Sequence, residues 1–141
     1  MIIIEYNKTD KAEVKIFISK TIEGIFGTEA RGLEDLENIK ENFEKFWIAK
    51  ENNKIIGTIG LKNEEKERKH RVTRMYVKES LRGKGIGKEL MRKLSSYCKD
   101  KKINSLFLTT YKQMNSSEFY KKMGFKETKI EGNVIRMERR V

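Results

Sequence analysis

The sequence predicts an α+β (mixed α/β) fold, with a central mixed but mostly antiparallel sheet of about seven strands flanked by four helices. Three observations lead to this prediction. Short apolar stretches of strand-forming residues alternate with longer stretches whose apolar residues recur every three or four positions. Two pairs of predicted strands are joined by short turns that contain Asn or Gly, which is typical of antiparallel hairpins. A glycine-rich turn connects another strand to an amphipathic helix.

The first third of the chain is predicted to hold one strand and two helices. The strand covers residues 2–6, and the first helix begins near Asp10 and ends at Gly24 or Gly27. A second helix is expected over residues 33–43, where apolar residues recur on one face. The apolar-spaced positions of the first helix are Val14, Phe17, Ile18, Thr21, Ile22 and Ile25.

The middle of the chain is predicted to form three strands, over residues 46–51, 55–61 and 72–77. A tight turn at residues 52–54 joins the first two strands into a hairpin. Residues 63–71 are so rich in charge that we expect an exposed loop or strand end there.

The last third is predicted to form a helix after the glycine-rich turn, a buried strand over residues 105–110, a short helix and a closing hairpin. Asn115, with Glu118 three residues later, resembles a capping box at the start of the short helix. The hairpin strands cover residues 125–130 and 134–139. The full order is β-α-α-β-β-β-α-β-α-β-β.

Composition favours one globular domain over residues 1–141. Hydrophobic residues make up 37% and charged residues 38%, and no apolar run approaches the ~20 residues of a membrane span. The single cysteine, Cys98, supports a reducing, cytoplasmic setting and is expected in the core, as is Trp47. The net charge of +11 is compatible with nucleic acid, an acidic membrane surface or a phosphorylated ligand, and it does not choose among them.

The glycine-rich turn reads Arg82-Gly83-Lys84-Gly85-Ile86-Gly87 and precedes a helix. Glycines let the backbone come close to a bulky anion or adopt positive φ, and the helix start adds unpaired N–H groups. The turn therefore predicts a phosphate or pyrophosphate site, although a tight connection without a ligand is the simpler alternative. The P-loop and dinucleotide patterns do not fit it, because Lys88 and Glu89 stand where those patterns need other residues.

The pattern that fits is Arg/Gln-x-x-Gly-x-Gly/Ala, and the turn resembles this signature of the GNAT superfamily of acetyl-CoA-dependent N-acetyltransferases. Residues 115–125, which read Asn-Ser-Ser-Glu-Phe-Tyr-Lys-Lys-Met-Gly-Phe, resemble a later segment of the same superfamily. One helix and one strand fit between the two blocks. The resemblance covers roughly residues 33–130 and implies the GNAT fold and acetyl-CoA as the acetyl donor.

The resemblance implies roles for individual residues. Tyr120 matches the general acid that protonates the coenzyme A thiolate, and core packing is the alternative for this residue. Asn115 matches a coenzyme contact, with a plain N-cap as its alternative. The resemblance implies no metal, and its coenzyme-binding positions are Met75, Tyr76, Val77, Arg82, Gly83, Lys84, Gly85, Ile86, Gly87, Lys88 and Asn115.

The general base and the acceptor stay open at this stage. His70, a carboxylate among residues 64–67, or a water relay could each take the proton of the amine. Glu29 could hold an ammonium group and Arg31 a carboxylate, which would suit an amino acid or a peptide as the acceptor. We therefore expect an N-acetyltransferase for a primary amine, active as a monomer or homodimer.

Two other functions compete with this one. A GNAT-fold protein can bind acyl-CoA as a regulator without catalysis, and the presence of Tyr120 argues against that function. A basic module for RNA or DNA is the other alternative. Its aromatic residues would interleave with basic ones, and here they do not.

Overall fold

The computed structural model describes residues 1–141, and its strands all belong to one sheet. The strands are β1 (Ile2–Glu5), β2 (Lys45–Glu51), β3 (Lys54–Glu64), β4 (Lys69–Val77), β5 (Ser105–Tyr111), β6 (Lys126–Glu131) and β7 (Val134–Arg140). The helices are α1 (Lys11–Phe26), α2 (Ile39–Asn42), α3 (Ile86–Asp100) and α4 (Ser117–Lys122). None of the helices has the length and hydrophobicity that a membrane span requires.

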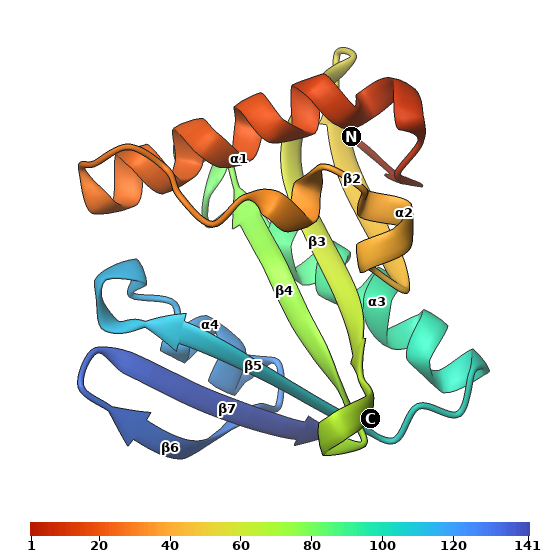
Figure 1. The fold of residues 1–141 in the computed structure, drawn as a ribbon, viewed down its shortest axis with the longest axis vertical. Helices are drawn as coiled ribbons and strands as arrows, with labels where there is room; N and C mark the ends of the chain where they lie inside the picture. Colours follow the sequence, from red (N-terminus) through yellow and green to blue (C-terminus); the bar gives the residue numbers. More distant parts are fainter.

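The seven strands have the spatial order β1-β2-β3-β4-β5-β7-β6. All neighbours are antiparallel except β4 and β5, which run parallel. Helices α1 and α2 cover one face of the sheet, and α3 and α4 lie on the other (Figure 1). The predicted mixed α+β class and the mostly antiparallel sheet are confirmed.

Each face of the sheet has its own hydrophobic core, and β2 shows how one strand serves both. Trp47 and Ala49 belong to the cluster under α3, whereas Phe46 and Ile48 belong to the cluster under α1 and α2. Successive side chains of a strand point to opposite faces, so a strand covered on both sides is apolar throughout. Cys98 on α3 is fully buried, as expected, and burial followed by the charge of Glu44 raises the pKa of its thiol to about 11.

The parallel pair β4 and β5 is short. The two strands pair only at His70 with Leu106 and at Arg71 with Phe107. Beyond these positions the strands diverge, as the V between them shows (Figure 1). The β5-facing edge of β4 from residue 72 to residue 77 therefore has no strand partner, and this opening positions the site described below.

The sequence-based prediction for the segment between α1 and β2 is wrong in detail. The predicted helix over 33–43 is instead a short 3-10 turn (Glu34–Leu36) followed by the four-residue α2. Asn38 leaves the helical region between them, with φ −134° and ψ 74°. The carboxylate of Asp35 accepts hydrogen bonds from Lys62 and Arg74 of the sheet. These side-chain contacts, and not a continuous helix, hold the segment against the sheet.

The charged stretch 63–71 holds the ends of two strands and the exposed turn between them, which agrees with the expected exposed loop or strand end. β3 runs to Glu64 and β4 starts at Lys69, with only a short 3-10 turn between them. The charges pair across the hairpin, since Glu64 is the register partner of Lys69 and also forms an ion pair with Arg71 at 3.3 Å. Opposite charges facing each other across two strands stabilise the pair, which charge density alone does not reveal.

A cleft between the diverging strands

The gap between β4 and β5 opens into a cleft of about 690 Å³. Its walls are the end of β4, the glycine-rich turn, the first turn of α3 and the short helix α4 with the residues before it. Ile25, near the C-terminus of α1, completes the lining. A cleft of this size with a mostly apolar lining is typical of small-molecule sites.

Most of the residues singled out from the sequence line this one cleft, although they come from four separate stretches of the chain. They are Met75, Tyr76, Val77, Arg82, Gly83, Gly85, Ile86, Gly87, Lys88, Asn115 and Tyr120. Three of the residues predicted to bind the coenzyme or the acceptor do not line it. Lys84 is exposed on the turn, and Glu29 and Arg31 are exposed on the segment between α1 and α2.

The turn requires glycine for two different structural reasons, backbone conformation and close packing. Gly83 and Gly85 have φ of 80° and 86°, a left-handed conformation that other residues adopt only with strain. Gly87 is helical, and a Cβ there would lie 3.0 Å from Cε of Met75 and 3.1 Å from Cζ of Phe119. Gly87 thus allows α3 to approach β4 and α4 closely.

The start of α3 leaves its first N–H groups without side-chain partners. Gly85 is the N-cap, and no side chain caps the helix. The unpaired N–H groups and the helix dipole make this end attractive to an anion. The side chain of Arg82 lies against the end of β4, because its Nε donates to the carbonyl oxygen of Val77 at 3.3 Å. Together with Lys88 it makes this end of the cleft cationic.

Tyr120 lies on α4 and is only 7% exposed, yet it lines the cleft. Its ring makes edge-to-face contacts with Phe119 and Phe125. Burial, and next the charge of Tyr76, raise the pKa of the Tyr120 phenol above its ordinary value. The residue is therefore both a core residue and a cleft residue, and its hydroxyl stays protonated across the neutral range.

The predicted capping box at Asn115 is wrong. Asn115 has φ 53° and ends the 3-10 turn that follows β5, while Ser116 is the N-cap of α4 without a side-chain hydrogen bond. Glu118 instead pairs with Lys121, one turn further along the helix. Asn tolerates the left-handed conformation better than most residues, so the chain uses it to turn into α4. Asn115 nevertheless lines the cleft.

Comparison with known proteins assigns the chain to a family. The sequence model of the acetyltransferase (GNAT) family matches residues 16–125, which include the whole glycine-rich turn and Tyr120. The chain belongs to the GNAT acetyltransferase family.

Individual acetyltransferases and a synthetase are similar to this chain. A GNAT-family acetyltransferase from Staphylococcus aureus is 30% identical, with a TM-score of 0.88 over 99% of this chain and 98% of that one. The PaiA N-acetyltransferase of Thermoplasma acidophilum, solved with coenzyme A, is 20% identical with a TM-score of 0.80 over the full length of both chains. The N-acetylaspartate synthetase of Xenopus tropicalis is 28% identical over 102 residues, and the match covers 68% of this chain but only 38% of that enzyme.

Several lining residues of this GNAT cleft were not predicted from the sequence. They are Ile25, Leu81, Met114, Ser116, Phe119, Lys122 and Met123. Those on α4 lie within the 115–125 motif, which could have indicated them. Ile25 carries no such signal, because only the fold brings the end of α1 to the cleft. Phe26, next to it, contacts Tyr111 at the end of β5 edge to face, with the ring centroids 5.6 Å apart.

His70, one of the candidate bases, lies outside the cleft lining. It is on β4, and its Nε2 lies 2.9 Å from Oε1 of Glu44. The other oxygen of Glu44 accepts a 2.7 Å hydrogen bond from the hydroxyl of Tyr97 on α3. The side-chain hydrogen bond of His70 therefore goes to Glu44, which is also bound from α3. The carboxylates of residues 64–67 also lie outside the lining.

Proposed function

We propose that this chain transfers the acetyl group of acetyl-CoA to a primary amine, on a small molecule such as an amino acid or on a peptide. The observation that carries the proposal is the composition of one cleft. A cationic glycine turn, a strand edge without a partner and a nearly buried phenol all line it. GNAT membership and the coenzyme A bound by the Thermoplasma neighbour support acetyl-CoA as the donor.

The glycine turn is the proposed site for the pyrophosphate of the coenzyme. Gly83 and Gly85 remove side chains from the approach, and the uncapped start of α3 offers N–H donors. The cations Arg82 and Lys88, and Lys84 from the outer side of the turn, add charge attraction. Asn115, on the opposite wall, would contact the coenzyme as well.

The unpaired edge of β4 is the proposed site for the acetyl and pantetheine groups. Backbone N–H groups of Met75, Tyr76 and Val77 would bind the pantetheine arm and polarise the thioester carbonyl. The neutral amine attacks the carbonyl carbon, so that a C–N bond forms and the C–S bond breaks. The amine loses one proton to water or a base. The departing thiolate accepts a hydrogen bond from Tyr120 and takes its proton from this hydroxyl or from solvent, and a Tyr120 that gives up its proton regains one from solvent. In this scheme no metal takes part.

The acceptor is proposed to enter from the side of α1 and the segment that follows it. Glu29 and Arg31 are exposed on this segment, where a carboxylate could hold an ammonium group and a guanidinium could hold a carboxylate. If they bind the acceptor, Glu29→Gln and Arg31→Gln should raise KM for the acceptor and leave acetyl-CoA affinity unchanged. We further propose that residues 1–141 form one domain that acts in the cytoplasm.

A screen for acetyl-CoA consumption tests this function. Release of the free coenzyme A thiol is followed with amino acids, simple amines, aminoglycosides and peptides as acceptors. We expect release that depends on one class of amine and yields its N-acetylated product by mass spectrometry. Coenzyme binding without release for any amine would favour the non-catalytic regulator. Salt-sensitive nucleic-acid binding without coenzyme affinity would contradict the proposal.

A further inference from the structure

Arg74 is the one residue of β4 with a left-handed backbone conformation, at φ 51°. The register between β3 and β4 shifts at this point, so that Arg74 forms a bulge just before the three β4 residues that line the cleft. A left-handed conformation is unfavourable for a residue with a Cβ and persists only where the surroundings hold it. Bulges next to a site commonly re-aim the strand.

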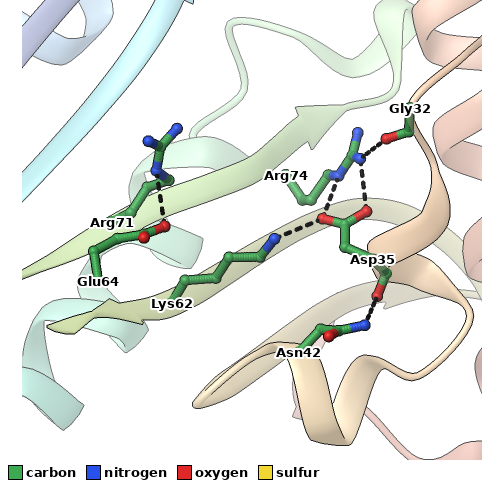
Figure 2. A network of polar contacts seen from close by, with 7 residues as sticks. All are labelled: Gly32, Asp35, Asn42, Lys62, Glu64, Arg71 and Arg74. Carbon is green, nitrogen blue, oxygen red and sulfur yellow. Dashed lines mark hydrogen bonds and ion pairs between the residues drawn. The ribbon is translucent and has the colours of Figure 1, made fainter. Parts of the chain in front are cut away.

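Both the backbone and the side chain of Arg74 are held by other elements. Thr58 is fully buried on the neighbouring strand β3, and its hydroxyl donates to the Arg74 carbonyl oxygen at 2.8 Å. The guanidinium donates to both Asp35 oxygens, at 2.7 Å from Nη2 and 3.2 Å from Nε (Figure 2). Nη2 also donates to the Gly32 carbonyl oxygen at 2.7 Å. Such a two-pronged pair fixes direction as well as distance.

Asp35 is held in turn by further groups. Lys62 on β3 donates to its carboxylate at 3.0 Å, and the side-chain amide of Asn42 donates to its carbonyl oxygen at 3.2 Å (Figure 2). The Arg74 and Asp35 side chains are only 12% and 17% exposed. Burial alone would raise the pKa of Asp35, but the hydrogen bonds and charges of Arg74 and then Lys62 hold it below its ordinary value.

This cluster connects two parts of the molecule that adjoin the cleft. One is the stretch of residues 27–38 between α1 and α2, which begins two residues after the lining residue Ile25. The other is the end of β4, which no longer has β5 beside it. The nearby ion pair of Arg71 and Glu64 differs, because it joins β4 only to the adjacent strand β3 (Figure 2).

We propose that Arg74 is a positioning residue, which ties the 27–38 segment to the bulge of β4 and so fixes how the edge at Met75–Val77 faces the acceptor side of the cleft. This inference rests on the proposed function. Arg74 does not line the cleft and need not touch either substrate. It acts through the backbone that follows it. Small misplacements of a reacting geometry cost large factors in rate, so the loss should be much larger in turnover than in coenzyme affinity, to which the glycine turn also contributes.

The experiment compares Arg74→Lys and Asp35→Asn with Arg71→Lys as the matched control on the same strand. Hydrogen exchange is measured for residues 27–38, residues 75–77 and α3, and acetyl-CoA affinity by calorimetry. For Arg74→Lys and for Asp35→Asn we expect faster exchange in residues 27–38 and 75–77 and unchanged exchange in α3. Acetyl-CoA affinity should stay within about threefold of wild type. With an acceptor from the screen, kcat should fall by roughly tenfold to a hundredfold. The double variant should lose little more than either single one.

Three results would overturn the proposal. Faster exchange in residues 27–38 alone, with unchanged kcat, would make Arg74 an ordinary ion pair. Faster exchange that includes α3 would assign the pair to general stability. An equal effect of Arg71→Lys would remove the special place of Arg74. Hydrogen exchange needs no turnover, so it tests the link between Arg74 and residues 27–38 even if the protein binds no acetyl-CoA. A lack of acetyl-CoA binding would instead contradict the proposed function.

Discussion

The hydroxyl of Tyr120 combines burial with access to the cleft, and this sets what it can do chemically. Burial raises its pKa, and so does the neighbouring Tyr76, so the phenol is a weaker acid than free tyrosine. A thiol titrates near ~8.5 and a phenol near ~10, so equilibrium does not favour full transfer of the proton. A hydrogen bond that strengthens as negative charge grows on sulfur is therefore the main contribution we expect from Tyr120.

Replacing Tyr120 with Phe should lower kcat by about a hundredfold or more, because the ring packing is kept while the donor is lost. Acetyl-CoA affinity should stay within about threefold of wild type, since the phenol acts mainly as charge develops. Steady-state kinetics and calorimetry measure the two effects. Tyr97→Phe is the matched control, because that phenol donates to Glu44 outside the cleft. An unchanged kcat for Tyr120→Phe would remove its proposed role.

Among the elements, the turn and helix starts show how one residue type serves unlike purposes. Gly85 needs its left-handed φ of 86°, whereas Gly24 lies inside α1 with open space where a Cβ would go. Alanine is favoured over glycine in a helix interior and disfavoured at positive φ. The same substitution should therefore have opposite effects on stability at the two positions.

Gly24→Ala should raise the free energy of unfolding by about 0.5–1 kcal/mol. Gly85→Ala should lower it by about 1–2 kcal/mol. Urea unfolding of both variants beside wild type measures the difference. A stabilising Gly85→Ala, or a destabilising Gly24→Ala, would contradict the assigned backbone conformations.

The elements also show what could be predicted from the sequence. The strands β2, β3 and β5 and the helices α1 and α3 were predicted near their observed bounds, because apolar periodicity reflects which face is buried. Helix α2 was overpredicted, since the engagement of Asp35 by Arg74 is a long-range contact that local spacing does not contain. Asn115 was assigned as a cap for a similar reason: its pattern is local, but the left-handed turn after β5 is set by the fold.

The candidate site divides in the same way. The glycine turn and residues 115–125 could be found because each is a contiguous motif that lines the cleft with its own residues. Ile25 and the arrangement around Arg74 could not be found, because they depend on how α1 and the 27–38 segment sit over the diverging strands. Only their residue types indicate Glu29 and Arg31, and their role in acceptor binding stays a prediction.

At the scale of the whole molecule, Asp35 links the helical layer to the sheet through Arg74 and Lys62. Its folded-state pKa is held below the ordinary value, which is near ~3.9 for an unfolded chain. A group with a depressed folded pKa contributes stability that is fully present above the unfolded pKa. That contribution is lost as the pH falls through the folded pKa.

Asp35→Asn should therefore reduce the free energy of unfolding by about the same amount at pH 7 and at pH 5, where the contribution of Asp35 is fully present. The difference from wild type should shrink below about pH 4, as wild-type Asp35 becomes protonated. Urea unfolding at pH 7, 5 and 3 measures this, with Glu131→Gln as an exposed ion-pair control. A difference between Asp35→Asn and wild type that grows as the pH falls would contradict the direction of the pKa shift.

The glycine turn at residues 82–87 is proposed to bind acetyl-CoA, and two glycines allow a matched test of this claim. Gly85 and Gly132 both have positive φ and open space at the Cβ position, but only Gly85 lines the cleft, while Gly132 lies in the β6–β7 hairpin. Calorimetry with acetyl-CoA is the measurement. Wild type and Gly132→Glu should bind alike, and Gly85→Glu should bind at least about a hundredfold more weakly, because a carboxylate would face the pyrophosphate. No binding by wild type, or equal losses in the two variants, would contradict the claim.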